Sequence, residues 1–188
     1  MRVTVPASSA NIGPGFDCLA VALDLLFHLD VGEPQQGATK LDANHPAAKS
    51  FADAGGEGPL FGETAIPPGK GLGFSGAARV AGLAAASIQS SGSIRYGDLL
   101  ARSGQLEGHS DNVAASIYGS VTAVNQDSVV RVRCPEELDV VVWIPDGKTS
   151  TDSSRKHLPA SVPFETATQA LARSSVLVAA IASGDLTA

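Results

Sequence analysis

A glycine-rich segment near the middle of the chain restricts the fold more than any other feature of the sequence. Four glycines fall between Pro67 and Ala78, in the run Pro-Pro-Gly-Lys-Gly-Leu-Gly-Phe-Ser-Gly-Ala-Ala. Glycine lets backbone N–H groups approach an anion without interference from Cβ atoms. We predict that residues 77–89, which are rich in alanine, form a helix whose positive dipole end faces this loop. The spacing alone allows either a phosphate-binding loop or a simple turn between two elements.

Two other phosphate-binding motifs can be tested against the same segment. The Walker pattern G-x-x-x-x-G-K-[ST] does not occur in the chain. Gly71, Gly73 and Gly76 fit the G-x-G-x-x-G pattern of dinucleotide-binding folds. That pattern requires a hydrophobic strand before the loop and a second strand that ends in an acid about twenty residues later. Two prolines open the segment and no apolar run precedes Asp98, so the context excludes the dinucleotide site.

Composition and charge exclude several classes of partner. Hydrophobic residues make up 44% of the 188 residues and charged residues 17%, which is typical of a globular chain. The net charge of −6 indicates no nucleic-acid partner and disfavours an anionic membrane surface. The two cysteines are too few for a disulfide framework, and we find neither a membrane-spanning run nor a secretion signal. We therefore expect a cytoplasmic protein without nucleic-acid or membrane partners.

Hydrophobic periodicity predicts an α+β fold in which strands come first, then helices, then strands. We expect strands at 3–5, 21–31, 120–124, 128–133 and 138–144, and helices at 46–54, 77–89, 96–106, 111–118 and 163–183. The first strand is expected to stop at Pro6, with a long loop over 7–17. The continuous apolar run 138–144 predicts a buried strand, and Gly184 is the expected end of the last helix.

Three segments together resemble the homoserine kinases. The run Pro6-Ala-Ser-Ser-Ala-Asn-Ile-Gly-Pro-Gly-Phe-Asp17 is similar to the substrate motif of that family, and Glu107-Gly-His-Ser-Asp-Asn112 is similar to its third motif. Residues 67–78 resemble the phosphate loop shared by galactokinase, homoserine kinase, mevalonate kinase and phosphomevalonate kinase, the GHMP superfamily. The central loop alone specifies the superfamily, and the other two motifs narrow it to homoserine kinase.

The resemblance implies a fold and an activity. We expect a GHMP kinase N-terminal domain (ribosomal S5 domain 2-like) over 1–148, a mixed sheet with helices packed on it. Residues 149–188 would begin a C-terminal ferredoxin-like domain that is largely absent, which would expose an apolar face and favour a homodimer. The implied reaction is the ATP- and Mg²⁺-dependent phosphorylation of the homoserine hydroxyl to O-phosphohomoserine in threonine biosynthesis. Two alternatives stay open, namely another GHMP kinase of a small alcohol and a non-catalytic nucleotide-binding module.

The resemblance also assigns site residues. It implies nucleotide binding by the loop residues Pro68, Gly69, Lys70, Gly71, Leu72, Gly73, Phe74, Ser75, Gly76 and Ala77. It implies Mg²⁺ binding by Ser75 and Glu107, and substrate binding by Asn11, Asp17, His109, Asn112 and Arg155. An Asp can pair with the ammonium of an amino acid, and an Arg fork can hold its carboxylate. Asp111 and Asn112 are the candidate catalytic residues.

Several of these residues also have simpler interpretations. Asp111 can accept the hydroxyl proton, but a helix N-cap explains it equally well. Asn11 and Asp17 can form turns in a Gly/Pro loop, and His109 can be a surface histidine. Arg155 can be solvated next to a lysine.

Phe74 is a departure from the family pattern, which usually has a small residue there. Its ring must enter an apolar pocket or crowd the nucleotide.

Overall fold

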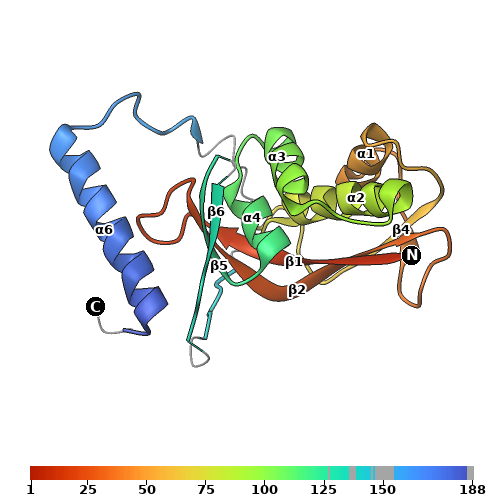
Figure 1. Ribbon diagram of the computed structural model, residues 1–188, viewed down its shortest axis with the longest axis horizontal. Coiled ribbons are helices and arrows are strands. Elements are labelled where there is room, and N and C mark those ends of the chain that lie inside the picture. The colour runs from red at the N-terminus through yellow and green to blue at the C-terminus, as the bar shows by residue number, and fades with distance from the viewer. Residues whose placement is uncertain (127, 136–138, 145, 147–154, 186–188) are drawn as a thin grey trace.

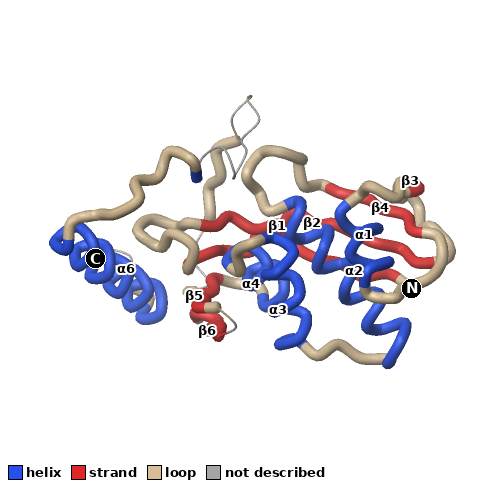
Figure 2. The backbone as a smooth tube through the Cα atoms, turned by 90° about the horizontal axis from the view of Figure 1, so that it is seen from above, coloured by secondary structure: helices blue, strands red, loops and turns tan. Residues whose placement is uncertain are grey.

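The computed structural model describes all residues except 127, 136–138, 145, 147–154 and 186–188. A 6-stranded sheet forms its centre, and every strand pairing within the described residues is antiparallel. Four helices, α1 to α4, lie on one face of the sheet, and the last helix, α6, stands beyond one end of it (Figure 1). Figure 2 shows the same separation from above. The α+β expectation is confirmed.

The long strand β2 organises the sheet. The strands are β1 (Arg2–Ala10), β2 (Leu19–Val31), β3 (Thr39–Lys40), β4 (Leu60–Thr64), β5 (Val121–Asn125) and β6 (Ser128–Val132). Strand β1 pairs along one edge of β2, whereas β4 and β5 share the other edge, one after the other. Strands β3 and β6 extend the sheet outside β4 and β5, respectively.

The helices supply the other half of the core. They are α1 (Pro46–Asp53), α2 (Phe74–Ser91), α3 (Tyr96–Glu107), α4 (Asp111–Tyr118) and α6 (Phe164–Ser183). Helix α2 buries a run of small residues between 76 and 86 against β1, β2 and the other three helices of its layer. Helix α6 packs on the sheet through Ile181, which joins Val121 and Val132 in a small second cluster. Within the described residues, no helix is both long and apolar enough to cross a bilayer.

The first strand is longer than we predicted. It continues past Pro6 to Ala10, and the pairing with β2 shifts between Pro6 and Ala7. Proline is tolerated because β1 is an edge strand and an irregularity in register absorbs the missing N–H group. The predicted long loop therefore begins at Asn11.

Two further predictions about elements were wrong. Residues 139–144, the described part of the predicted buried strand, form no strand, and Val141 is 95% and Trp143 82% exposed. An apolar run becomes a buried strand only when other elements cover it, and among the described residues of this run Val142 alone is partly buried against the core. Helix α2 begins at Phe74, three residues earlier than expected, because the loop already turns into the helix at Gly73.

Several other element predictions were right. Helices α1, α3 and α4 and the β5–β6 hairpin lie within a residue or two of their expected bounds. Gly184 ends α6 in the left-handed conformation, as predicted. Strand β4 was missed because its sequence shows no clear alternation. The expected domain boundary at 148–149 lies outside the described residues and stays a prediction.

Candidate active site

The glycine loop is held against the free edge of β1. The backbone N–H of Ser8 donates to the Leu72 carbonyl at 3.2 Å. Gly73 adopts a φ of +66° immediately before α2, and a Cβ at this position would lie 2.3 Å from Ser8 Oγ. No side chain caps the first turn of α2. Its N-terminal amides and the loop backbone therefore form a concave surface with a positive dipole, which suits an anion.

A cavity of about 400 Å³ brings the three sequence motifs together. Its walls include six of the ten predicted nucleotide-binding residues, Gly69, Gly71, Gly73, Phe74, Ser75 and Gly76. They also include Asn11 and Phe16 from the first motif, Glu107, His109 and Asn112 from the third motif, and Arg155. Segments almost 150 residues apart in the sequence therefore share one site.

The remaining loop residues face elsewhere. Leu72 and Ala77 are buried in the hydrophobic core. Lys70 Nζ donates to the carbonyl of Asp146 at 2.6 Å. Pro68 is not part of the cavity wall. Leu72 and Ala77 can therefore offer a ligand only their backbone atoms.

Ser75 and Glu107 meet at one guanidinium nitrogen. Ser75 lies in the first turn of α2, and Glu107 is the last residue of α3. Arg79 Nη1 donates to Ser75 Oγ at 2.9 Å and also forms an ion pair with the Glu107 carboxylate. One cation thus touches both oxygens that the sequence assigns to a metal. A hydroxyl and a carboxylate are ligands that Mg²⁺ accepts, so the residues present fit such an ion.

His109 is oriented by a buried carboxylate. Its Nδ1 donates to Asp111 Oδ1 at 2.8 Å, and Asp111 is only 1% exposed. The hydrogen bond to Asp111 outweighs burial and raises the pKa of His109 above its ordinary value of 6.5. Asp111 Oδ1 also accepts from the backbone N–H of Asn112 at 2.7 Å. Asp111 itself does not line the cavity.

The N-cap alternative for Asp111 was wrong in detail. Ser110 occupies the N-cap position and Asp111 is the first residue of α4. Its Oδ1 accepts from His109 and from the adjacent amide, whereas its buried Oδ2 has no hydrogen-bond partner among the described residues. Neither oxygen caps the helix in the usual way.

Asn112 is anchored to the first strand. Ser8 is fully buried, and its hydroxyl donates to Asn112 Oδ1 at 2.9 Å. Ser116, one turn further along α4, donates to Ser8 Oγ at 3.3 Å. Strand β1 and helix α4 are therefore joined beside the glycine loop, and the Asn112 side chain is held with one face toward the cavity.

The first motif forms a closed loop that carries an ion pair. The backbone N–H of Asp17 donates to Asn11 Oδ1 at 2.8 Å. This bond spans six residues and closes the loop, so it is not the two-residue turn of the simpler interpretation. Arg155 Nη1 donates to Asp17 Oδ2 at 2.9 Å, and its second terminal nitrogen pairs with the other carboxylate oxygen. The guanidinium carbon lies 5.2 Å from the centroid of the Phe16 ring. Arg155 is thus a half-buried partner of Asp17 rather than a solvated residue.

Phe74 lies in an aromatic cluster and still touches the cavity. Its ring meets Phe27 edge-on at 6.1 Å between centroids and His45 at 5.7 Å. His45 stacks on Phe27 at 5.7 Å, and burial lowers the pKa of His45. The Phe74 ring therefore enters a pocket among other rings, which is the first of the two alternatives that we considered for it.

Three residues of this region were missed from sequence. Arg79 follows the loop serine by four residues, one helical turn, and that spacing was the available signal. Ser8 and Phe16 lie inside the first motif, but only the folded chain shows their contacts with Asn112 and Arg155.

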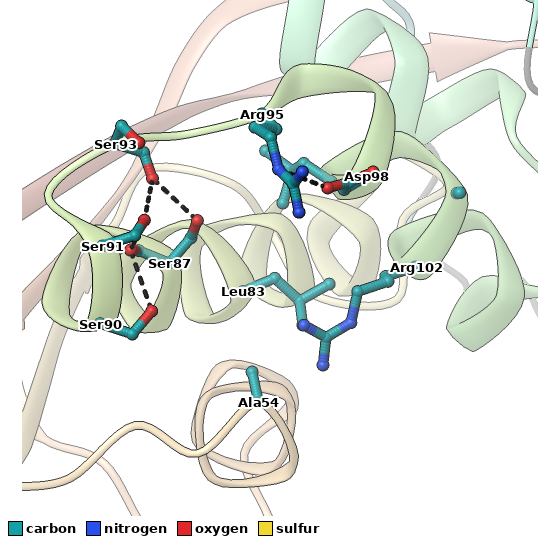
Figure 3. Close-up of a pocket in the computed structure, with 11 residues that line it drawn as sticks. Ala54, Leu83, Ser87, Ser90, Ser91, Ser93, Arg95, Asp98 and Arg102 are labelled. Carbon is teal, nitrogen blue, oxygen red and sulfur yellow. Dashed lines mark hydrogen bonds and ion pairs between the residues drawn. The ribbon is translucent and has the colours of Figure 1, made fainter.

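A second cavity, of about 560 Å³, lies between α2 and α3 (Figure 3). Two of its hydroxyl groups are bonded within the protein, because Ser87 Oγ and Ser91 Oγ both donate to the Ser93 carbonyl just beyond α2. Arg95 pairs with Asp98 at 2.8 Å. These contacts end one helix and begin the next, so the first cavity is the better candidate for chemistry.

Comparison with known proteins places the chain in a family. The GHMP kinases N-terminal domain matches residues 43–120. A homoserine kinase from Leuconostoc citreum is 34% identical over 98% of this chain and 69% of its own length. One from Desulfitobacterium hafniense is 36% identical over 96% of this chain and 68% of its own length.

A solved structure agrees with the sequence relatives. A Listeria monocytogenes protein described as a homoserine kinase superimposes with a TM-score of 0.79 at 29% identity, and the match covers 98% of this chain and 69% of that chain. The predicted GHMP N-terminal fold is thereby confirmed. On its fold, its motifs and these relatives, the chain belongs to the homoserine kinase family within the GHMP kinases.

Proposed function

We propose that the protein transfers the γ-phosphoryl group of ATP, with Mg²⁺, to the side-chain hydroxyl of homoserine. The product would be O-phosphohomoserine, a step of threonine biosynthesis. The single observation that carries this proposal is the shared cavity, whose wall contains an uncapped helix N-terminus, Ser75, Glu107 and Arg155. Arg155 pairs with Asp17, which is not itself part of the wall. Such a transfer depends mainly on positioning and charge stabilisation.

The nucleotide phosphates would lie against the glycine loop. Backbone N–H groups around Gly71, Gly73 and the first turn of α2 are the donors for them. Ser75 and Glu107 would hold Mg²⁺, which neutralises charge on the phosphates when bound. Among the described residues there is no cluster of three or more His, Cys, Asp or Glu side chains suited to a metal. The remaining ligands would therefore be phosphate oxygens and water.

The substrate would replace the ion pair between Asp17 and Arg155. The homoserine carboxylate can accept the two guanidinium donors that Asp17 now occupies, and its ammonium can pair with the released Asp17 carboxylate. A ligand with only one of the two charges would leave one partner unpaired, which costs free energy in a half-buried site. The pair therefore favours a zwitterion over a simple alcohol.

His109 and Asn112 would orient the substrate from the third motif. Both side chains line the cavity, and both are held from behind, His109 by Asp111 and Asn112 by Ser8. Because Asp111 is buried and its Oδ1 accepts from His109, we assign it a positioning role that acts through His109. Asn112 keeps its proposed contact with the reacting hydroxyl.

A coupled assay of ADP release tests the proposal. We expect turnover with homoserine, dependent on Mg²⁺, and little with analogues that lack either the ammonium or the carboxylate group. Turnover with an uncharged alcohol instead would favour another kinase of the superfamily. Binding of ATP without turnover of any substrate would favour a non-catalytic module.

We also propose a homodimer in the cytoplasm. Support for the dimer comes from large apolar side chains that face solvent, such as Trp143, Phe164 and Leu171. The location fits a reaction that consumes ATP and a free amino acid. Sedimentation equilibrium would test the dimer, and a monomer would contradict it. Cell fractionation would test the cytoplasmic location.

A further inference from the structure

The guanidinium group of Arg79 stands between the two side chains that would bind a divalent ion. Its Nη1 atom contacts both Ser75 Oγ and the Glu107 carboxylate, the two groups that the proposed function gives to a divalent ion. Glu107 is only 12% exposed and Arg79 is 29% exposed, so the pair is shielded from solvent. A second cation placed between the same oxygens would meet the guanidinium at close range, where like charges repel strongly.

A neighbouring cavity offers the guanidinium another place. The Arg79 side chain also lines a cleft of about 180 Å³ between α1 and the end of α3, together with Asn44, Lys49 and Asp53. Asp53 is exposed on α1 and supplies a carboxylate there, whereas Lys49 opposes a second cation. Arginine has a long side chain that can change rotamer while its stem stays packed.

We propose that Arg79 is a resident cation of the metal site, which holds Ser75 and Glu107 together until the metal–nucleotide complex displaces it toward Asp53. The proposal rests on the proposed function, because it takes Ser75 and Glu107 to be the metal ligands. Arg79 is thus a positioning residue. It keeps Glu107 paired in the empty protein, and it sets how much metal is required for nucleotide to bind.

The test measures binding rather than turnover. A fluorescent ATP analogue is titrated with Mg²⁺ or Mn²⁺ in the absence of homoserine, and the metal concentration at half-saturation is recorded. Arg79→Met should lower that concentration about fivefold, the factor expected when a competing pair of modest strength is lost. Asp53→Asn should raise it, because the displaced guanidinium loses its acceptor.

Matched variants separate this inference from the proposed function. Arg95→Met removes the same charge from an exposed pair on α3 and should leave the metal requirement unchanged. Ser75→Ala should weaken metal-dependent nucleotide binding. An unchanged or higher metal requirement in Arg79→Met, alongside a clear loss in Ser75→Ala, overturns the inference alone. No loss in Ser75→Ala overturns the metal assignment and the inference with it.

A second substitution, Arg79→Gln, provides the same test if the Arg79→Met protein does not fold. Arg79→Met leaves the shielded Glu107 carboxylate without its cation. Arg79→Gln keeps a hydrogen-bond donor but no charge, so it should show the same lowered metal requirement.

Discussion

Two arginine side chains beside the cavity are paired with residues that the proposed function assigns to ligands. Arg79 joins Ser75 to Glu107, and Arg155 joins Asp17. Each pairing compensates a partly shielded charge, and under the proposed function a ligand of matching charge would take the place of one partner. At the scale of single residues, the proposed binding of metal and substrate would replace two existing pairings rather than fill an unpaired charged pocket.

Ser75 carries the clearest prediction at this scale. We expect Ser75→Ala to lower kcat/KM by about 100-fold or more, the scale of a lost electrostatic contact in the transition state, while the fold is kept. Steady-state kinetics and circular dichroism measure the two effects. Ser90→Ala, an exposed position on the same helix, is the control and should match the wild type. Near-normal activity in Ser75→Ala would remove this residue from the metal site.

The His109–Asp111 pair predicts a dependence on pH. The folded-state pKa of His109 lies above 6.5 because of Asp111, so the pair's contribution to stability is complete below the unfolded pKa. It is lost as the pH rises through the folded pKa. Asp111→Asn should lower the pKa of His109, observable by NMR titration, and the difference in Tm from the wild type should narrow toward alkaline pH.

The matched control for this pair is Asp98→Asn, which removes a carboxylate from an exposed position on α3. It should leave the His109 titration as in the wild type. A titration of His109 that is the same in Asp111→Asn would show that the pair does not set its pKa.

At the scale of elements, the glycine loop was predictable because its signal is local. The spacing of Gly71, Gly73 and Gly76 and the alanines that follow need no knowledge of the rest of the chain. The Arg155–Asp17 pair was predictable only as two separate substrate contacts, because the partners lie 138 residues apart and pair only in the folded chain. The prediction of a buried strand at 138–144 was wrong for a related reason. Burial depends on other elements that cover the residues, and not on the apolar run alone.

The contact between α1 and α2 depends on a missing side chain. A Cβ at Gly82 would lie 2.2 Å from Ser50 Oγ and 2.3 Å from the Ala47 carbonyl. We expect Gly82→Ala to lower the free energy of unfolding by about 2 kcal/mol, because the helices must move apart.

Gly97 provides the contrasting helix position. A Cβ there meets nothing within 4 Å, so Gly97→Ala should raise the free energy of unfolding by about 0.5 kcal/mol or more. Urea denaturation of both variants checks the pair of predictions. Equal effects of the two substitutions would mean that helix propensity outweighs the packing of α1 on α2.

At the scale of the whole molecule, a shielded ion pair between Arg2 and Asp30 holds the start of the chain against β2. Arg2 donates to both oxygens of Asp30 at 2.8 Å, and Asp30 is 1% exposed. The hydrogen bond from Arg2 is the main cause that lowers the pKa of Asp30 below its ordinary value of 3.8.

The pH at which the protein unfolds in acid tests the contribution of the Arg2–Asp30 ion pair to stability. The stabilisation is present above the unfolded pKa and is lost as the pH falls through the folded pKa. We expect Arg2→Met to unfold at a higher pH than the wild type in an acid titration followed by far-UV circular dichroism. If Arg2→Met and the wild type unfolded at the same pH, the Arg2–Asp30 pair would not be a stabilising contact.

The hydrogen bond between Ser8 and Asn112 connects residues 104 positions apart, and the glycine loop rests on the same strand end. A partly assembled chain that has formed its helices but not this junction would have no place for a nucleotide. Recovery of ATP-analogue binding during refolding should consequently lag behind recovery of helical signal, which makes the ligand a reporter of the last stage of assembly.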